Sequence, residues 1–390
     1  MLYSHNVRDP IQVHHFSSQL QTMSKNSTEL PLFIAVDQEG GSVARIRKNT
    51  QVLPAAMAIG ATHSSQLSFL AGKMTATDLA AMGINMNLAP VLDVNTNEEN
   101  SVIGIRSFGE DPELVSQLGM WYIEGLQSQG VVATAKHFPG HGGTALDSHF
   151  TIPVINKNLD DLEKFNLIPF RRAMENGLDA VMTAHISVPS LDPSGLPATF
   201  SYNLLTNIMR KKMNFDGIVI TDDLEMKSIQ NQCSSGQAAL KAVLAGADMV
   251  MIGWSDQKKK EVFNTLLNAV TTGKLSEERL NVSVKRILKL KLKRGLFNAH
   301  REPSSDTWVQ RAPSSAVAQN IANHAVTVVS NESSTLPFRE DDGRRVLLIT
   351  SVPQFYQALK FTYGKVTPYY ISSRPTITEV EKTVSALIAK

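Results

Sequence analysis

The loop from Lys136 to His149, KHFPGHGGTALDSH, concentrates three histidines and an aspartate in a segment rich in glycine and proline. Imidazole and carboxylate side chains can bind a metal ion, transfer protons or orient one another. Glycine and proline interrupt regular structure, so this segment is expected to be an irregular loop. Three kinds of site are therefore open: a metal centre, a phosphate-binding turn and a mobile catalytic arm.

The spacing of these residues favours the catalytic arm. His137, His141 and His149 do not form a compact helical pair of ligands, so we expect no metal ion and no other cofactor. A phosphate-binding turn leads into a helix, whereas this loop continues through FTIPVINKNLDD. If the segment is extended, Asp147 and His149 point to the same side. The carboxylate can then fix the tautomer of the imidazole and support its protonated form.

Further candidate groups follow other apolar runs. GIVITDDLEM ends in Asp222 and Asp223, and only one of two successive strand side chains can face inward. A carboxylate at the mouth of an apolar barrel is costly unless it is paired or used in chemistry. In AVDQEGGSVARI, Asp37 and Arg45 either bind ligand hydroxyls or cap a strand beside a surface arginine. Arg106, in VIGIRSFGEDP, either points into the same region or pairs with a nearby acid.

Apolar runs alternate with amphipathic segments from residue 31 onward. Continuously apolar strands with helices between them indicate a parallel sheet that is covered on both faces. Most of the runs end in titratable residues, and the C-terminal strand ends form the active site of a β/α barrel. An open sheet would gather function at one switch point instead. We therefore predict a TIM-type (β/α)8 barrel with strands within residues 31–37, 84–94, 131–138, 178–185, 217–223 and 247–254.

A second unit is predicted towards the C-terminus. Residues 274–297 have the pattern of a basic amphipathic helix that ends a barrel domain of residues 1–297. Residues 298–315 form a polar linker, and residues 316–390 form the beginning of an α/β sandwich domain. Within it we expect helices at 316–325, 353–363 and 377–390, and strands at 326–330, 345–351 and 366–372.

The composition excludes several classes of protein. The chain has 390 residues, of which 42% are hydrophobic and 19% are charged, and its formal net charge is +2. This near-neutral balance argues against nucleic-acid binding driven by charge. We find no run of about 18 apolar residues, so we expect no membrane span. The single cysteine, Cys233, excludes an internal disulfide.

The motifs, taken in order, resemble the bacterial β-N-acetylhexosaminidases of glycoside hydrolase family 3. The matching segments are AVDQEGG, LAPVLDVN, IRSFGEDP, KHFPGHGxxxxDSH, MTAHI, PATFS and ITDDLEM. The resemblance covers roughly residues 1–300, and residues 315–390 resemble the start of the second domain of the longer members. It implies a retaining exo-β-N-acetylglucosaminidase that acts on peptidoglycan fragments or chitooligosaccharides through a covalent glycosyl-enzyme intermediate.

The resemblance also implies residue roles. Asp222 would be the nucleophile, His149 the general acid/base, and Asp147 its orienting partner, although most glycosidases use a second carboxylate as the acid/base. An aspartate and a histidine titrate apart, with ordinary pKa values of ~3.9 and ~6.5. His141 has no implied role and is expected to be structural. The residues that would bind the terminal sugar are Asp37, Arg45, Arg106, Lys136, His137 and, more weakly, His185.

In the family, MLYSHNV corresponds to the end of the second barrel strand. We therefore expect a barrel that lacks its first strand, does not close completely and is poorly stable. The resemblance favours a monomer that is secreted or associated with the cell wall, with the cytoplasm as the alternative. Two other functions stay open: a family 3 β-glucosidase and an inactive sugar-binding fragment. The balance between hydrolysis and phosphorolysis also stays open, because histidine repels phosphate less than a carboxylate does.

Overall fold

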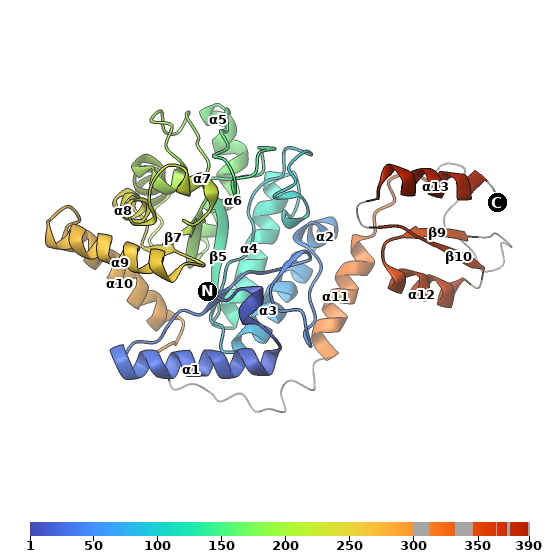
Figure 1. Cartoon of the computed structure of the whole chain (residues 1–390), viewed down its shortest axis with the longest axis horizontal. Helices are drawn as coiled ribbons and strands as arrows, with labels where there is room; N and C mark the ends of the chain where they lie inside the picture. Colours follow the sequence, from blue (N-terminus) through green and yellow to red (C-terminus); the bar gives the residue numbers. More distant parts are fainter. Residues whose placement is uncertain (299–311, 332–345, 364, 373–374, 389–390) are drawn as a thin grey trace. The chain divides into compact units, whose positions relative to one another are not determined.

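The computed structural model describes residues 1–298, 312–331, 346–363, 365–372 and 375–388. The chain divides into two compact units, Met1–Val326 and Thr327–Lys390 (Figure 1). Each unit is described by itself below. No helix within these ranges is long and apolar enough to cross a lipid bilayer.

The larger unit is built on a curled parallel sheet in the order β1-β4-β5-β6-β7-β8. Its strands are β1 (Ala35–Val36), β4 (Met86–Asn87), β5 (Val132–Phe138), β6 (Ala180–Thr183), β7 (Ile218–Asp223) and β8 (Met249–Met251). All six lie within the apolar runs that the sequence predicted. Leu2 adds a parallel bridge to Val36. In the described part of the chain no ladder joins β8 to β1, which confirms the prediction of an incompletely closed barrel.

Helices surround the sheet of the larger unit (Figure 1). The longer ones are α1 (Pro10–Thr28), α3 (Ser65–Ala81), α4 (Pro112–Ser128), α6 (Ile168–Glu175), α8 (Ser235–Ala245), α9 (Asp256–Thr271) and α10 (Glu277–Lys293). Shorter ones are α2 (Ala56–Ala61), α5 (Leu159–Asp161) and α7 (Lys227–Gln230), and a hairpin of β2 (Gln38–Gly40) and β3 (Val43–Ala44) follows β1.

Local chemistry sets the start of several helices. Asp111 begins α4 because its carboxylate accepts a hydrogen bond from the Glu113 N–H at 3.0 Å. Pro112 occupies the first helical position, where no N–H is needed. Asp9 and Pro10 begin α1 in the same way. Aspartate followed by proline therefore starts both helices.

Two apolar cores pack against the two faces of the sheet. Successive strand side chains point to opposite faces, so neighbours in the chain enter different cores. Val132 and Met182 fill the core inside the curl, whereas Ala133 and Val181 pack between the sheet and the helices. Leu290 of α10 joins the inner core. The basic helix predicted at 274–297 therefore packs its apolar side against the barrel.

Helix α11 (Ala312–Ala325) belongs to the larger unit, where it packs on α2 and α3 through the buried residues Ala318 and Ile321. The sequence predicts this helix, at 316–325, as part of the second domain of residues 316–390, and these domain bounds stay a prediction. By its internal contacts the chain divides after Val326. The predicted linker, residues 298–315, lies mostly outside the described residues.

The smaller unit contains a short α/β arrangement. Parallel strands β9 (Val346–Thr350) and β10 (Val366–Tyr370) are connected by α12 (Pro353–Thr362), and α13 (Ile377–Ile388) follows. The strand predicted at residues 326–330 is wrong, because this segment belongs to no strand. Among the described residues this segment pairs with no neighbouring strand. Its valines are therefore left exposed: Val326, Val328 and Val329.

Candidate active site

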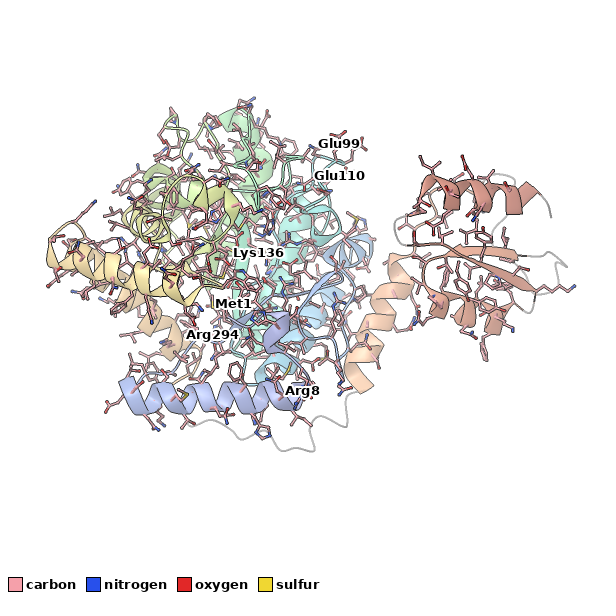
Figure 2. All side chains as sticks on the ribbon, in the orientation of Figure 1. Met1, Arg8, Glu99, Glu110, Lys136 and Arg294 are labelled. Atoms are coloured by element: carbon pink, nitrogen blue, oxygen red, sulfur yellow. The ribbon has the colours of Figure 1, made fainter. Side chains whose placement is uncertain are left out.

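The carboxyl ends of the barrel strands meet around Lys136, which lies deep inside the larger unit, whereas Glu99 and Glu110 lie at its edge (Figure 2). The pairing register shifts at two of these strand ends, within residues 135–138 of β5 and residues 220–223 of β7. Such irregularities re-aim side chains. They occur where Lys136, His137 and Asp222 lie, so the strand ends are shaped to present these groups.

Two connected cavities open at this end of the sheet. The inner cavity has a volume of about 180 Å³, and the outer one a volume of about 630 Å³. Five residues line both cavities: Asp37, Arg45, His149, Asp222 and Met251. The proposed nucleophile and acid/base therefore lie where the two cavities meet.

The loop after β5 brings Asp147 and His149 into contact. Asp147 Oδ1 lies 2.7 Å from His149 Nδ1 and accepts a hydrogen bond from the His149 N–H at 2.8 Å. Partial burial alone would raise the pKa of Asp147, but these bonds from His149 hold it below its ordinary value. The ionised carboxylate makes Nδ1 the donor, which leaves Nε2 as the ring nitrogen for a substrate.

Asp222 and Asp223, at the end of β7, have different surroundings. Burial alone would raise the pKa of Asp222, but His185, His137 and the Asp223 N–H hold it below its ordinary value. Burial raises the pKa of Asp223, whose Oδ2 accepts a hydrogen bond from Tyr3 Oη at 3.3 Å. Of the adjacent pair, Asp222 is thus the carboxylate favoured in its ionised form, and it lines both cavities.

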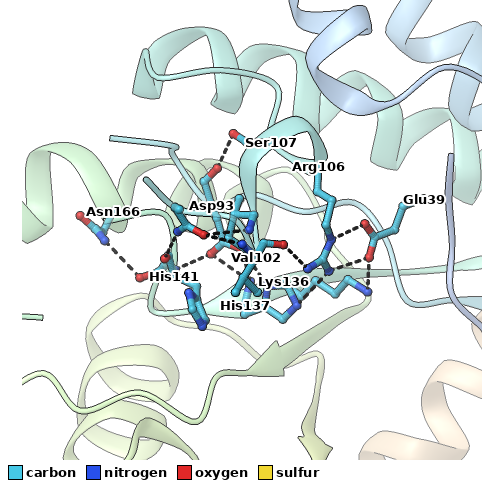
Figure 3. A network of polar contacts seen from close by, with 12 residues as sticks. Glu39, Asp93, Val102, Arg106, Ser107, Lys136, His137, His141 and Asn166 are labelled. Carbon is cyan, nitrogen blue, oxygen red and sulfur yellow. Dashed lines mark hydrogen bonds and ion pairs between the residues drawn. The ribbon is translucent and has the colours of Figure 1, made fainter. Parts of the chain in front are cut away.

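A chain of ion pairs forms the wall of the inner cavity (Figure 3). Lys136 Nζ lies 2.8 Å from Asp37 Oδ1 and 2.7 Å from Glu39 Oε1. Arg106 binds Glu39 with two N–H groups, at 2.8 and 2.9 Å, and Arg45 lies 3.3 Å from Asp37. Burial opposes the charge on Glu39, but Lys136 and Arg106 hold its pKa well below its usual range. Arg106 therefore pairs with Glu39 of β2 and not with Glu110 or Asp111, the acids close to it in the chain.

Asp93 holds the next pair of groups in place. Its Oδ2 lies 2.7 Å from His137 Nδ1, and its Oδ1 accepts a hydrogen bond from the His141 N–H at 2.6 Å (Figure 3). His137 Nε2 lies 3.4 Å from Arg106 Nη2. Burial alone would raise the pKa of Asp93, but His137 holds it below its ordinary value. Asp93 therefore fixes the orientation of the His137 ring at the cavity wall.

His141 is anchored through its backbone, because its carbonyl also accepts a hydrogen bond from Asn100 Nδ2 at 3.0 Å. Its ring lines the inner cavity, and burial lowers the pKa of the imidazole. Neither ring nitrogen has a hydrogen-bond partner within the described residues. The backbone contacts agree with the structural role expected from the sequence.

The side chain of His185 is held by two hydrogen bonds. Its Nδ1 lies 2.7 Å from Thr199 Oγ1, and its Nε2 lies 3.1 Å from the Asp223 carbonyl. Its side chain is fully buried and lines neither cavity. His185 thus lies outside the lining of both cavities, burial lowers the pKa of its imidazole, and its role as a weak sugar ligand stays a prediction.

Sequence reasoning missed the roles of Glu39 and Asp93. Glu39 lies inside AVDQEGG, and Asp93 ends an apolar strand, so both positions carried a signal. Their partners, Arg106 and His137, are distant in the chain, and only the fold identifies them. Within the described ranges, no group of three or more His, Cys, Asp or Glu side chains is arranged to hold a metal ion.

Comparison with known proteins identifies the family. The profile of the glycosyl hydrolase family 3 N-terminal domain matches residues 1–290. The match covers the whole barrel and every candidate catalytic residue described above. The chain therefore belongs to glycosyl hydrolase family 3.

Among curated relatives, β-hexosaminidase A of Pseudoalteromonas piscicida is 35% identical over 94% of this chain, which spans 65% of that protein's length. The β-hexosaminidase of Nitrosomonas eutropha is 36% identical over 72% of this chain and 81% of its own length. Among solved structures, a family 3 β-N-acetylglucosaminidase from Paenibacillus sp. str. FPU-7 matches with a TM-score of 0.91 and 36% identity. That match covers 99% of this chain and 76% of the Paenibacillus chain.

Proposed function

We propose that this chain is an exo-acting, retaining β-N-acetylglucosaminidase that removes terminal β-linked N-acetylglucosamine from peptidoglycan fragments or chitooligosaccharides. The observation that carries the proposal is that Asp222 and His149, whose Nδ1 lies 2.7 Å from Asp147 Oδ1, both line the two cavities where these meet. The names of the relatives, β-hexosaminidase and β-N-acetylglucosaminidase, support the same substrate class.

The inner cavity suits the terminal sugar. Asp37, Arg45, Arg106, Lys136 and His137 line it and supply charged donors and acceptors for hydroxyl groups. Because the ion pairs among them already fix these side chains, the binding groups are held in place before substrate arrives. A small cavity of about 180 Å³ accepts one sugar unit, which supports an exo mode of action.

In the first chemical step, Asp222 attacks the anomeric carbon while His149 Nε2 gives its proton to the glycosidic oxygen. Asp147 stabilises the imidazolium before transfer and keeps Nδ1 protonated throughout. In the second step, His149 takes a proton from water, which attacks the anomeric carbon and releases Asp222. Two inversions at one carbon retain the β configuration. All of these groups come from one chain, so the proposal includes a monomeric enzyme.

The proposal is tested with 4-nitrophenyl N-acetyl-β-glucosaminide and the matching β-glucoside. We expect hydrolysis of the first at a kcat/KM at least tenfold higher, and loss of activity in Asp222→Ala. Preference for the glucoside would favour the β-glucosidase alternative. A wild-type protein that binds N-acetylglucosamine but cleaves neither compound would point to the inactive sugar-binding alternative.

A further inference from the structure

The outer cavity extends beyond the residues assigned to the terminal sugar. It shares Asp222 and His149 with the inner cavity and extends away from them to the start of the chain and the end of β8. Glycosidases cleave the bond between the terminal sugar and its leaving group at the nucleophile and the acid. If the terminal sugar fills the inner cavity, the leaving group must lie in the outer one.

Three aromatic rings lie together in the outer cavity: Tyr3 and His5 from the start of the chain and Trp254 from the segment after β8. The rings of Tyr3 and Trp254 have centroids 4.7 Å apart, and those of His5 and Trp254 are 5.2 Å apart. Tyr3 and His5 are nearly parallel, with an interplanar angle of 6°. Trp254 is 60% exposed, although it is a large apolar side chain. Exposed apolar surface beside a polar catalytic centre is characteristic of a ligand-binding surface.

Hydrogen bonds hold this aromatic surface in place. The backbone N–H of Trp254 donates to Glu225 Oε2, which fixes the backbone that carries the indole, and Tyr3 Oη donates to Asp223 Oδ2 at 3.3 Å. Gly253 allows the close approach, because a Cβ there would lie 2.3 Å from Tyr3 Oη and 2.4 Å from Asp223 Oδ2. The rings are therefore positioned before a ligand arrives, which reduces the entropy lost on binding.

The charges around the outer cavity disfavour an anionic leaving group. Four carboxyl groups line it, those of Asp37, Asp222, Asp223 and Glu225. Among the described residues that line it, the lysine and arginine side chains are Arg45, which pairs with Asp37, and Lys227. From outside the lining, Lys136 also pairs with Asp37, and Lys258 lies 3.5 Å from Glu225, so Asp222 and Asp223 are the carboxyl groups without an ion pair among the described residues. A leaving group with carboxylates would gain little attraction here, whereas a neutral sugar pays no electrostatic penalty.

We propose that Trp254, supported by Tyr3 and His5, forms the subsite for the leaving group, and that this subsite takes a neutral pyranose ring. The C–H face of such a ring packs on the indole, and its hydroxyls face the polar rim of the cavity. A second N-acetylglucosamine of a chitooligosaccharide has this chemistry. The inference rests on the proposed function and selects one of its two substrate classes.

The test compares Trp254→Ala with the wild-type enzyme on two substrates that share the terminal sugar. N,N′-diacetylchitobiose has a pyranose leaving group, whereas methyl N-acetyl-β-glucosaminide has no ring to stack. We expect kcat/KM for chitobiose to fall about tenfold, as for loss of one aromatic contact, and kcat/KM for the methyl glycoside to change less than twofold. Trp254→Phe should recover most of the loss.

Trp121→Ala is the matched control, because Trp121 is a partly exposed tryptophan on α4 that packs against Phe69 and lines neither cavity. It should leave the ratio of the two kcat/KM values unchanged. Equal loss on both substrates in Trp254→Ala, or loss on neither, would overturn the subsite while leaving the proposed function intact. A higher wild-type kcat/KM for an N-acetylglucosaminyl-N-acetylmuramyl peptide than for chitobiose would overturn the proposal that the subsite prefers a neutral sugar. Failure of the wild-type enzyme to cleave any of these compounds would overturn both proposals.

Discussion

The carboxylates of the site differ in the groups that contact them, and these groups determine whether each carboxylate is held in an ion pair. Lys136 neutralises Asp37 and Glu39, while Asp147 is bonded to His149. Within the described part of the chain Asp222 forms no ion pair with a lysine or arginine, and nearby imidazole rings favour its ionised form. An ionised carboxylate that is not committed to an ion pair is suited to act as a nucleophile.

Asp147→Asn tests the support that the carboxylate gives to His149. The amide keeps a similar shape but removes the negative charge that stabilises the imidazolium, so proton donation should weaken. We expect kcat on chitobiose, which has a poor leaving group, to fall about 100-fold. A dinitrophenyl glycoside, whose leaving group needs no proton, should lose much less in the glycosylation rate measured by stopped flow.

Asp160→Asn is the control for this prediction, because Asp160 is an exposed aspartate on α5, later in the same connection. It should behave as the wild-type enzyme. Equal losses on both substrates in Asp147→Asn would show that the carboxylate does not act through proton transfer.

Glu39→Gln tests the electrostatic network at the cavity wall. The pKa of Glu39 is depressed in the folded state, so its ion pairs stabilise the fold above the ordinary carboxyl pKa of about 4.3. This stability is lost as the pH falls from there towards the folded-state pKa. We expect the variant to be less stable by about 3 kcal/mol at pH 7, because the substitution leaves buried cations uncompensated.

Urea denaturation at pH 7 and at successively lower pH measures this difference. The difference in unfolding free energy between wild type and Glu39→Gln should narrow as the pH falls below about 4.3, because the unfolded wild-type chain then takes up a proton at Glu39 that the folded protein does not. Glu124→Gln, at an exposed position of α4, should show no gap at either pH. A gap that stays constant with pH would contradict the electrostatic explanation.

At the level of elements, helices α3 and α4 pack with their backbones in close approach. A Cβ at Gly125 of α4 would lie 2.2 Å from the Phe69 carbonyl oxygen and 2.7 Å from the Lys73 nitrogen, both in α3. These are backbone atoms of a helix, so relief requires the two helices to separate. The close packing positions the loops before α4 and after β5 that carry site residues.

Gly125→Ala should therefore destabilise the protein although alanine is the better helix former. We expect a loss of about 2 kcal/mol in the free energy of unfolding, the usual size for overpacking. Glu124→Ala, one residue earlier and exposed, should stay within about 0.5 kcal/mol of the wild type. Thermal and urea unfolding measure both variants, and a neutral or stabilising Gly125→Ala would contradict the packing geometry.

For the whole molecule, the sequence predicted the barrel because its strands are continuously apolar, and six such runs became β1, β4, β5, β6, β7 and β8. It also placed the site at the strand ends. Sequence patterns were not sufficient where an apolar segment could pack against more than one part of the fold. The valine-rich segment at 326–330 found no strand to pair with, and the apolar side of α11 packs on the larger unit.

In the candidate active site, too, some residues were predicted from the sequence and others were identified only from the fold. Residue types and spacing predicted the Asp147–His149 pair, whereas the choice of Asp222 over Asp223 as nucleophile came from the family resemblance. The partner of Arg106 and the burial of His185 depend on which strand ends become neighbours. Sequence spacing carries no information on such long-range pairs, so only the fold could assign them.

Asp222 is expected to form a covalent bond with the terminal sugar during turnover. The direct measurement is to react the enzyme with a 5-fluoro-N-acetylglucosaminyl fluoride, which slows breakdown of the intermediate, and to map the labelled peptide by tandem mass spectrometry. We expect one sugar attached to Asp222, in the peptide that contains ITDDLEM, and no label in Asp222→Ala. A label on Asp223, or turnover of the wild-type enzyme with inversion and no adduct, would contradict it.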